Sequence, residues 1–206
     1  MGERLVLLYA GHRLYRALRR RRIARADARR MVARYRELIR AHLTAQGARP
    51  GDAFYSHQLN MFTGLSVYEL LAAAGFQKAD AILVYEEMVG PMRVFAGMLH
   101  RGADLTPRGF EIVRDSVKRD MTDGLAGHFT WEIVQDDADA FEYKITRCPY
   151  VDTFAKAGCP EFCIAFCEHD RAAYDALRRH VRFIRTGRTL AEGGPCCHDR
   201  FERVKR

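Results

Sequence analysis

Cysteines are the residues of this sequence whose type and spacing most directly suggest chemistry. All six lie between Cys148 and Cys197, in the last third of a 206-residue chain. In a stretch with helical character, Cys163 and Cys167 are four residues apart, and Asp170 follows Cys167 by three. Residues at these spacings share one face of a helix. We therefore expect this helix to present a thiol with a carboxylate one turn further on, and a buried Asp would need a partner.

Clustered cysteines allow three interpretations: disulfides, metal ligands or catalytic thiols. No signal peptide is recognised at the N-terminus, so we expect a cytoplasmic protein whose thiols stay reduced. In that setting clustered cysteines more often serve metal binding or catalysis than disulfides. None of the spacings is a CxxC pair, which argues against a zinc finger or ribbon. We interpret Cys159, Cys163 and Cys196 as packing residues, and Cys148, Cys167 and Cys197 as site thiols.

The net charge of +8 belongs to one part of the chain. Residues 1–50 hold 14 Arg and 3 acidic residues, whereas residues 51–206 carry a net charge of −3. The run Arg19–Arg22 suggests a nucleic-acid or acidic-membrane surface. No helix-turn-helix pattern or interleaved aromatic residues accompany it, so we favour the solvated face of a helix that packs on the body or on another subunit.

Periodicity predicts an α+β protein with a helical N-terminal half and a small, mostly antiparallel sheet with flanking helices. An apolar stripe predicts one long helix over residues 14–45. The expected domain division is a helical region, 1–126, and a cysteine-containing α+β region, 127–206, together forming one integrated domain. Further helices are expected at 67–74, 78–87, 92–102 and 106–123, then before Gly158 and after Pro160, and strands at 129–135, 140–146, 181–186 and 197–204.

Four segments of the C-terminal half carry a resemblance to a known family. They are Cys148-Pro149-Tyr150, Cys167-x-x-Asp170, Thr189-Leu190-x-Glu192-Gly193 and Cys197-x-x-Arg200-Phe201. In this order they resemble the L-2-amino-thiazoline-4-carboxylic acid hydrolase family, over roughly residues 128–204. That family usually ends in Cys-Asp-Phe-Arg-Phe, whereas this chain has His198 in place of the Asp.

The resemblance implies hydrolysis of a cyclic isothiourea to N-carbamoyl-cysteine, and two mechanisms fit the residues. In the first, the Cys167 thiolate attacks the ring carbon, Asp170 acts as base or orienting group, and Cys148 or Cys197 assists. In the second, Cys148, Cys167 and Cys197 hold a zinc-like ion that activates water. We favour the first, without a cofactor, because three thiolates make a poor Lewis acid.

Basic residues near the cysteines complete the expected site. Arg147 and Arg200 adjoin cysteine segments, where a positive charge favours the thiolate. Arg185 and Arg188 have the planar fork that binds a substrate carboxylate. We expect substrate binding by Arg147, Arg188, Arg200 and His198.

A non-catalytic thiol or metal-binding protein, or a sensor, remains the alternative function, since the same cysteines would serve it. The expected partner is a small-molecule substrate, and a carboxylate on it would suit the arginines. We expect no membrane span and no nucleic-acid partner. The N-terminal helix offers a surface for a homo-oligomer.

Overall fold

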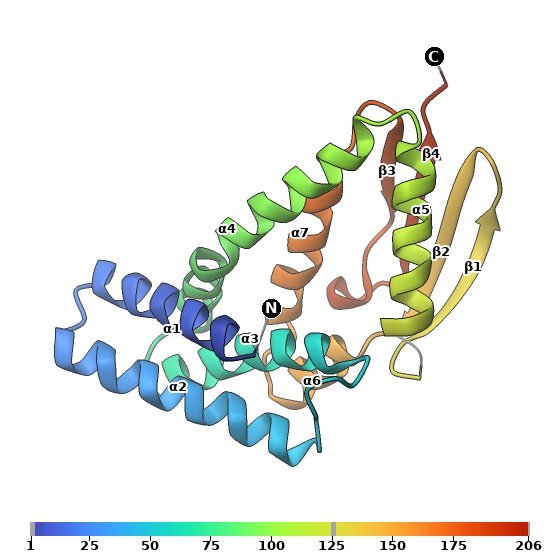
Figure 1. Cartoon of the computed structure of the whole chain (residues 1–206). Helices are drawn as coiled ribbons and strands as arrows, with labels where there is room; N and C mark the ends of the chain where they lie inside the picture. Colours follow the sequence, from blue (N-terminus) through green and yellow to red (C-terminus); the bar gives the residue numbers. More distant parts are fainter. Residues whose placement is uncertain (1–2, 125–126, 206) are drawn as a thin grey trace. The chain divides into compact units, whose positions relative to one another are not determined.

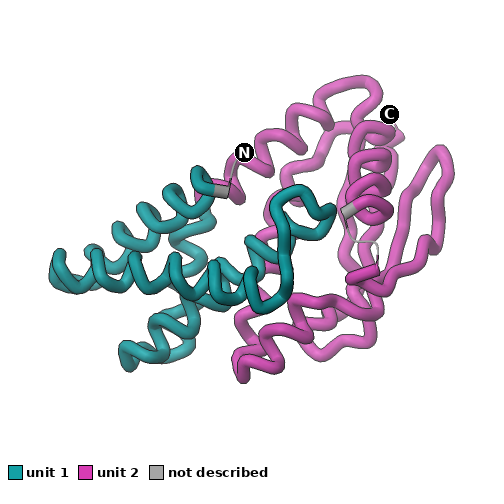
Figure 2. Tube along the Cα trace, turned by 60° about the horizontal axis from the view of Figure 1, so that its bottom comes forward, with its two compact units in different colours: residues 1–90 teal, residues 91–206 magenta. Residues whose placement is uncertain are grey.

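The structure is a computed structural model that describes residues 3–124 and 127–205. Within these residues the chain forms seven α-helices and a four-stranded antiparallel sheet (Figure 1). It divides into two compact units, residues 1–90 and 91–206 (Figure 2). The predicted α+β class, with a mostly helical N-terminal half, is confirmed.

Unit 1 is helical. It contains α1 (Glu3–Arg20), α2 (Arg25–Ala45), α3 (Tyr55–Ala73) and the first part of α4 (Lys78–Asp104). Val32, Tyr35, Ile39 and Leu43 of α2 are buried, so the predicted apolar stripe is confirmed. Helix α3 buries residues on several faces, because apolar and small residues follow one another along its middle.

The prediction of one helix over residues 14–45 is wrong, because α1 ends at Arg20. Arg22 adopts the left-handed conformation, with φ of 63°. The Ile23 N–H donates to the Leu18 carbonyl at 3.2 Å, and the Arg22 N–H donates to the Arg19 carbonyl at 3.1 Å. These two bonds form a Schellman motif. The left-handed position of this motif is usually a glycine. Because this chain has Arg22 there, no sequence signal indicated that the helix ends.

Unit 2 begins within α4 and contains the sheet. The helix α4 continues through Pro91, where the sequence predicted an interruption. The sheet has the order β1-β2-β4-β3, and every neighbouring pair is antiparallel. The elements of this unit after α4 are α5 (Gly109–Arg119) with a π-helical turn (Asp120–Gly124), β1 (Thr130–Asp136), β2 (Ala140–Arg147), α6 (Pro149–Lys156), α7 (Phe162–Tyr174), β3 (Val181–Thr186), a 3-10 turn (Leu190–Glu192) and β4 (Cys197–Arg203).

The two faces of the sheet differ because side chains alternate along each strand. One face carries Phe141 and Phe201, which pack with Phe110 and Val113 of α5 in the core of the unit. The opposite face carries charged and polar residues, among them Glu142, Arg200 and Glu202. The core therefore lies on the helix-covered face, and this is the face on which Cys197 and Asp199 also fall by strand alternation.

Asp104, at the end of α4, fixes the connection that leads from α7 into β3. Its carboxylate accepts the backbone N–H groups of residues 178 to 181, at 2.6 to 2.8 Å. Burial raises the pKa of Asp104, but these four donors outweigh it and the net pKa is lowered. The carboxylate thus holds the start of β3 in place.

The predicted division at 126/127 meets residues 125 and 126, which lie outside the described part of the chain. The two compact units of the structure meet at Gly90–Pro91. Helix α5, assigned from the sequence to the helical region, contributes Phe110 and Val117 to the core of the sheet-containing unit. The expected integration of the two regions stays a prediction.

Candidate active site

Cys148 lies where β2 gives way to α6. It has an extended backbone, with φ of −128° and ψ of 120°, and Pro149 opens the helix behind it. A hydrogen bond from Cys163 is the main reason that the pKa of the Cys148 thiol is lowered. Burial raises the pKa of Cys148, whereas the backbone N–H groups of Val151 and Tyr150 lower it further. The Cys148 side chain does not form a standard capping hydrogen bond to α6. The start of α6 therefore favours a thiolate, as helix N-termini do.

Cys163 is the central thiol of a hydrogen-bonded series of three. It lies on α7 and is hydrogen-bonded to Cys148 and to Cys167, one turn further along the same helix. These two hydrogen bonds, and then burial, raise the pKa of Cys163 far above its usual value. Cys163 consequently keeps its proton, and its single S–H donates to one neighbouring sulfur at a time. The sequence had placed Cys163 among the packing residues.

Cys167 is the second thiol whose pKa is lowered. The hydrogen bond from Cys163 is the main cause, and the positive charge of Arg185 contributes. Burial and the charges of Asp170 and Cys148 act in the opposite direction. Since Cys148 and Cys167 share one donor and repel each other when charged, we describe them as a pair that favours a single thiolate.

Cys197 differs from Cys148 and Cys167 in that the pKa of its thiol is raised. Its sulfur accepts the Leu190 N–H at 3.4 Å, but burial is dominant and raises the pKa of the thiol to about 12. Glu192 stabilises the turn that carries Leu190, because its Oε2 accepts both the N–H (2.8 Å) and the hydroxyl (2.9 Å) of Thr189. The Thr-Leu-x-Glu-Gly segment thereby places a backbone donor at the Cys197 sulfur.

A buried ion pair lies on the same face of the sheet. Arg185 of β3 and Asp199 of β4 are cross-strand partners, joined by Nε–Oδ1 at 2.7 Å and Nη2–Oδ2 at 2.9 Å. The hydroxyl of Tyr143, opposite Asp199 on β2, donates to Oδ2 at 3.3 Å. The remaining Arg185 nitrogen, Nη1, donates to the Cys167 carbonyl at 3.0 Å. These contacts across β2, β4 and β3 thus hold the Arg185 guanidinium against α7, the helix that carries Cys163 and Cys167.

Asp170 lies one turn beyond Cys167, as the sequence predicted. Its side chain is open to solvent, yet the surrounding protein removes enough of its hydration to raise its pKa to about 6. The Arg185 charge lowers this pKa, and the charges of Asp199 and Asp120 raise it. At neutral pH the carboxylate is therefore mostly ionised but more basic than an ordinary Asp, which suits a general base.

The expected site residues divide into two groups. Cys148, Cys167, Asp170 and Cys197 lie near enough in unit 2 to shift one another's pKa values. His198 and Arg200 lie on the opposite face of the sheet, because they alternate with Cys197 and Asp199 along β4. There Glu142 contacts both of them.

The other two expected arginines lie at the edges of this region. Arg147 is exposed and pairs with Asp152 at 3.1 Å. Arg188 is exposed and donates to the Glu192 carbonyl oxygen. In the described residues no carboxylate forms an ion pair with Arg188. Arg185, in contrast, uses two of its nitrogen atoms to donate to Asp199.

Sequence reasoning missed two of the central residues, Cys163 and Asp199. The four-residue spacing from Cys167 was the available signal for Cys163. For Asp199 the signal was its two-residue spacing from Cys197, which puts both side chains on one face of a strand. A charged residue on the buried face of a strand requires a partner, and Arg185 is that partner.

The described residues contain neither a metal-binding cluster nor a membrane-spanning helix. In residues 3–124 and 127–205, no three side chains of His, Cys, Asp or Glu are arranged to hold a metal ion. None of the helices in these ranges is long and apolar enough to span a membrane. All six cysteines are free thiols.

Fold and site together describe an α+β protein in which several cysteines of unit 2 lie close to one another. The chain belongs to the L-2-amino-thiazoline-4-carboxylic acid hydrolase family, whose model matches residues 58–201. No curated protein and no solved structure matches the chain.

Proposed function

We propose that this protein opens a thiazoline-type cyclic isothiourea, or a related small heterocycle, by a cysteine-dependent hydrolysis. The observation that supports it best is the hydrogen-bonded series of Cys148, Cys163 and Cys167. One thiol in this series keeps its proton, and the two beside it have lowered pKa values. A protein that packs cysteines only as small apolar residues has no need of such charge separation.

Cys167 is the proposed nucleophile. It lies beside the cation Arg185 and one turn before Asp170, so a thiolate and a base occupy one helix face. Cys148 has a lowered pKa as well and is the second candidate. Cys197, with a pKa of about 12, stays a thiol and serves as a hydrogen-bond donor to substrate.

The chemistry consumes one water. The thiolate adds to the ring carbon that carries one sulfur and two nitrogens, and the ring C–S bond then breaks. The departing sulfur takes a proton from solvent. The product is then an isothiourea attached to Cys167.

Hydrolysis of this adduct restores the enzyme. Asp170 removes a proton from the attacking water, and the resulting tetrahedral carbon expels the Cys167 thiolate. The released product is the N-carbamoyl derivative of the ring-opened aminothiol. Asp170 then returns its proton to solvent, so atoms and charges balance over the cycle.

A substrate carboxylate requires a cation that is not already paired. Arg185 is occupied by Asp199, so its positive charge acts on Cys167 and on the sheet. Within the described part of the chain the Arg188 side chain bonds to a backbone carbonyl and to no carboxylate, so it has nitrogen atoms to offer. We assign it the carboxylate and predict that it sets the KM for acidic substrates.

The test is release of a thiol from 2-amino-thiazoline-4-carboxylate, read with a thiol reagent in the wild type and in Cys167→Ala. We expect release by the wild type and a loss of at least about 100-fold in Cys167→Ala, because a covalent nucleophile has no substitute in Ala. Cys196→Ala is the matched control and should keep its activity.

Metal analysis of the same preparations separates the alternatives. A stoichiometric metal that is lost with any one of Cys148, Cys167 or Cys197 would contradict the metal-free mechanism. Tight zinc binding without any thiol release across a panel of isothioureas would favour the non-catalytic metal-binding protein or sensor.

A further inference from the structure

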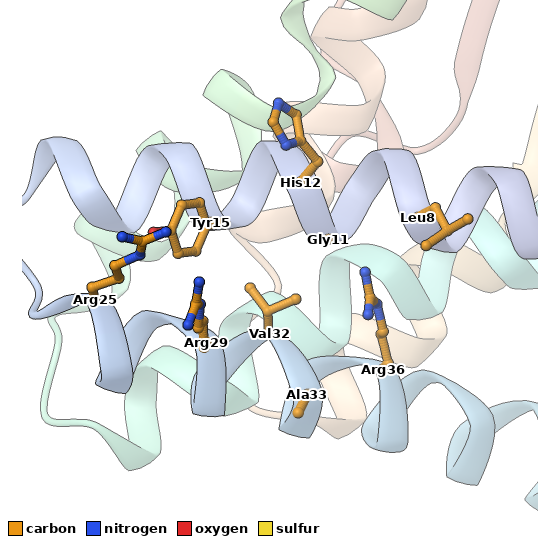
Figure 3. A pocket seen from close by; sticks show the side chains of 9 residues that line it. All are labelled: Leu8, Gly11, His12, Tyr15, Arg25, Arg29, Val32, Ala33 and Arg36. Atoms are coloured by element: carbon orange, nitrogen blue, oxygen red, sulfur yellow. The ribbon is translucent and has the colours of Figure 1, made fainter.

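Unit 1 contains a groove that the hydrolase site does not involve. It lies between α1 and α2 and has a volume of about 470 Å³, within the range of small-molecule sites. Figure 3 shows three guanidinium groups that extend from α2 toward α1. The lining residues are Leu8, Gly11, His12 and Tyr15 of α1 and Arg25, Arg29, Val32, Ala33 and Arg36 of α2.

The three arginines form one stripe. Positions 25, 29 and 36 fall within about 40° of each other around a helix with 3.6 residues per turn. Like charges at a four-residue spacing, such as Arg25 and Arg29, destabilise an isolated helix. An arrangement that gathers three of them on one groove is therefore unfavourable unless an anion lies there.

No carboxylate of the described residues neutralises this stripe. Other arginines of α1, α2 and the turn between them do have partners: Arg20 and Arg21 pair with Glu87, and Arg34 pairs with Glu37. Among the side chains that the structure describes, in residues 4–123 and 127–205, none forms an ion pair with Arg25, Arg29 or Arg36. The lining residues themselves include no acidic side chain.

Arg36 has the strongest requirement for a ligand. Its Nε is buried and has no hydrogen-bond partner. Its guanidinium lies against the backbone of α1 at Gly11, where a Cβ would come within 2.7 Å of Nη2. Glycine inside a helix lowers helix stability, but here it makes room for this side chain. A buried donor without a partner is expensive, and an anionic oxygen in the groove would supply the acceptor.

From these observations we infer that the α1–α2 groove binds a phosphate-bearing ligand, carried by a free small molecule or by a lipid headgroup. Three guanidinium forks match the oxygens of phosphate better than point charges do. Leu8, which lines the groove, and Leu5 on the same helix are 56% and 59% exposed, so an apolar neighbour is available to a lipid or to the organic part of a metabolite.

The test uses inorganic pyrophosphate by calorimetry and vesicles of phosphatidylcholine with 30% phosphatidylserine by co-sedimentation, both at about 0.15 M salt. Arg29→Gln and Arg36→Gln should each weaken binding of the responding probe at least tenfold. Arg29→Lys, which keeps the charge but loses the fork, should give an intermediate loss. Arg16→Gln is the matched control, because Arg16 is an exposed arginine of α1 outside the groove.

Binding of pyrophosphate alone identifies a free ligand, and binding to vesicles identifies a headgroup. Failure of both probes would overturn the inference. So would an equal effect of Arg16→Gln, since that would reveal only diffuse charge attraction. Binding of a duplex DNA oligonucleotide in place of either probe would likewise overturn it. Circular dichroism of each variant confirms that the helices remain folded, and thiol release by the same variants tests the hydrolase site separately.

Discussion

Arg185 and Asp199 face each other across β3 and β4 through two parallel hydrogen bonds, on side chains that are 13% and 4% exposed. The same arginine donates to the Cys167 carbonyl and lowers the pKa of the Cys167 thiol. One ion pair therefore connects the sheet to the helix that bears the proposed nucleophile.

We expect Arg185→Gln to lower the free energy of unfolding by about 3 kcal/mol, because it leaves the Asp199 carboxylate buried without a partner. The double variant with Asp199→Asn should regain part of this loss. Arg182→Gln is the control, because its pair with Glu202 is exposed and worth about 1 kcal/mol or less. Urea denaturation measures all four proteins. Equal effects of Arg185→Gln and Arg182→Gln would contradict the assigned role.

Cys163→Ala should raise the pKa values of both Cys148 and Cys167, because it removes the S–H that stabilises their thiolates. The measurement is the pH dependence of alkylation by iodoacetamide, with the modified residue identified by mass spectrometry. In the wild type, Cys148 or Cys167 should react first near neutral pH, and Cys197 should react only in strong alkali. Cys196→Ala should leave these rates unchanged. Preferential alkylation of Cys197 would contradict the proposed charge states.

The raised pKa of Asp170 should make activity and stability depend on pH in opposite directions. Activity should fall as the pH drops through about 6, since the base must be ionised. Its pKa is raised on folding, so the folded state binds a proton more tightly than the unfolded state between about pH 4 and 6. Stability therefore decreases as the pH rises through this window.

Asp170→Asn removes the cost of ionising this group in the folded state. The variant should melt at a higher temperature than the wild type at pH 7.5 and at the same temperature near pH 3.5. It should also lose the acidic limb of the activity profile. A melting temperature below that of the wild type at pH 7.5 would show that the carboxylate stabilises the fold instead.

Asp104→Asn should destabilise the protein by about 3 kcal/mol, because two of the four backbone N–H groups lose a charged acceptor worth roughly 1.5 kcal/mol each. The pKa of Asp104 is lowered on folding. Its contribution is therefore present above about pH 4 and is lost as the pH falls through the folded-state pKa. Asp137→Asn, at an exposed turn, is the control and should cost less.

Arg200→Gln and Arg188→Gln should separate the two faces of the sheet. Arg200 contacts Glu142 and Glu202 on the polar face, so its loss should reduce stability and leave KM unchanged. Arg188→Gln should raise KM for carboxylate-bearing substrates with little change in stability. A rise in KM for Arg200→Gln would support the sequence-based expectation that it binds substrate.

Local patterns in the sequence were sufficient for much of this protein. The sequence pattern located all four strands, and the spacing of Cys167 and Asp170 placed both on one helix face. Strand alternation also puts Cys197 and His198 on opposite faces of β4. These are short-range properties, set by the geometry of a helix or strand, so a single sequence contains them.

Only the tertiary structure decided which face of β4 meets the helices, and therefore that Cys197 and Asp199, and not His198 and Arg200, lie on the side of the thiols. It also joined Cys148 to Cys163 and Arg185 to Asp199. Each of these pairs depends on strand pairing or helix packing between segments that are distant along the chain. The residue types made such contacts chemically suitable, but chain geometry over 14 or more residues selected them.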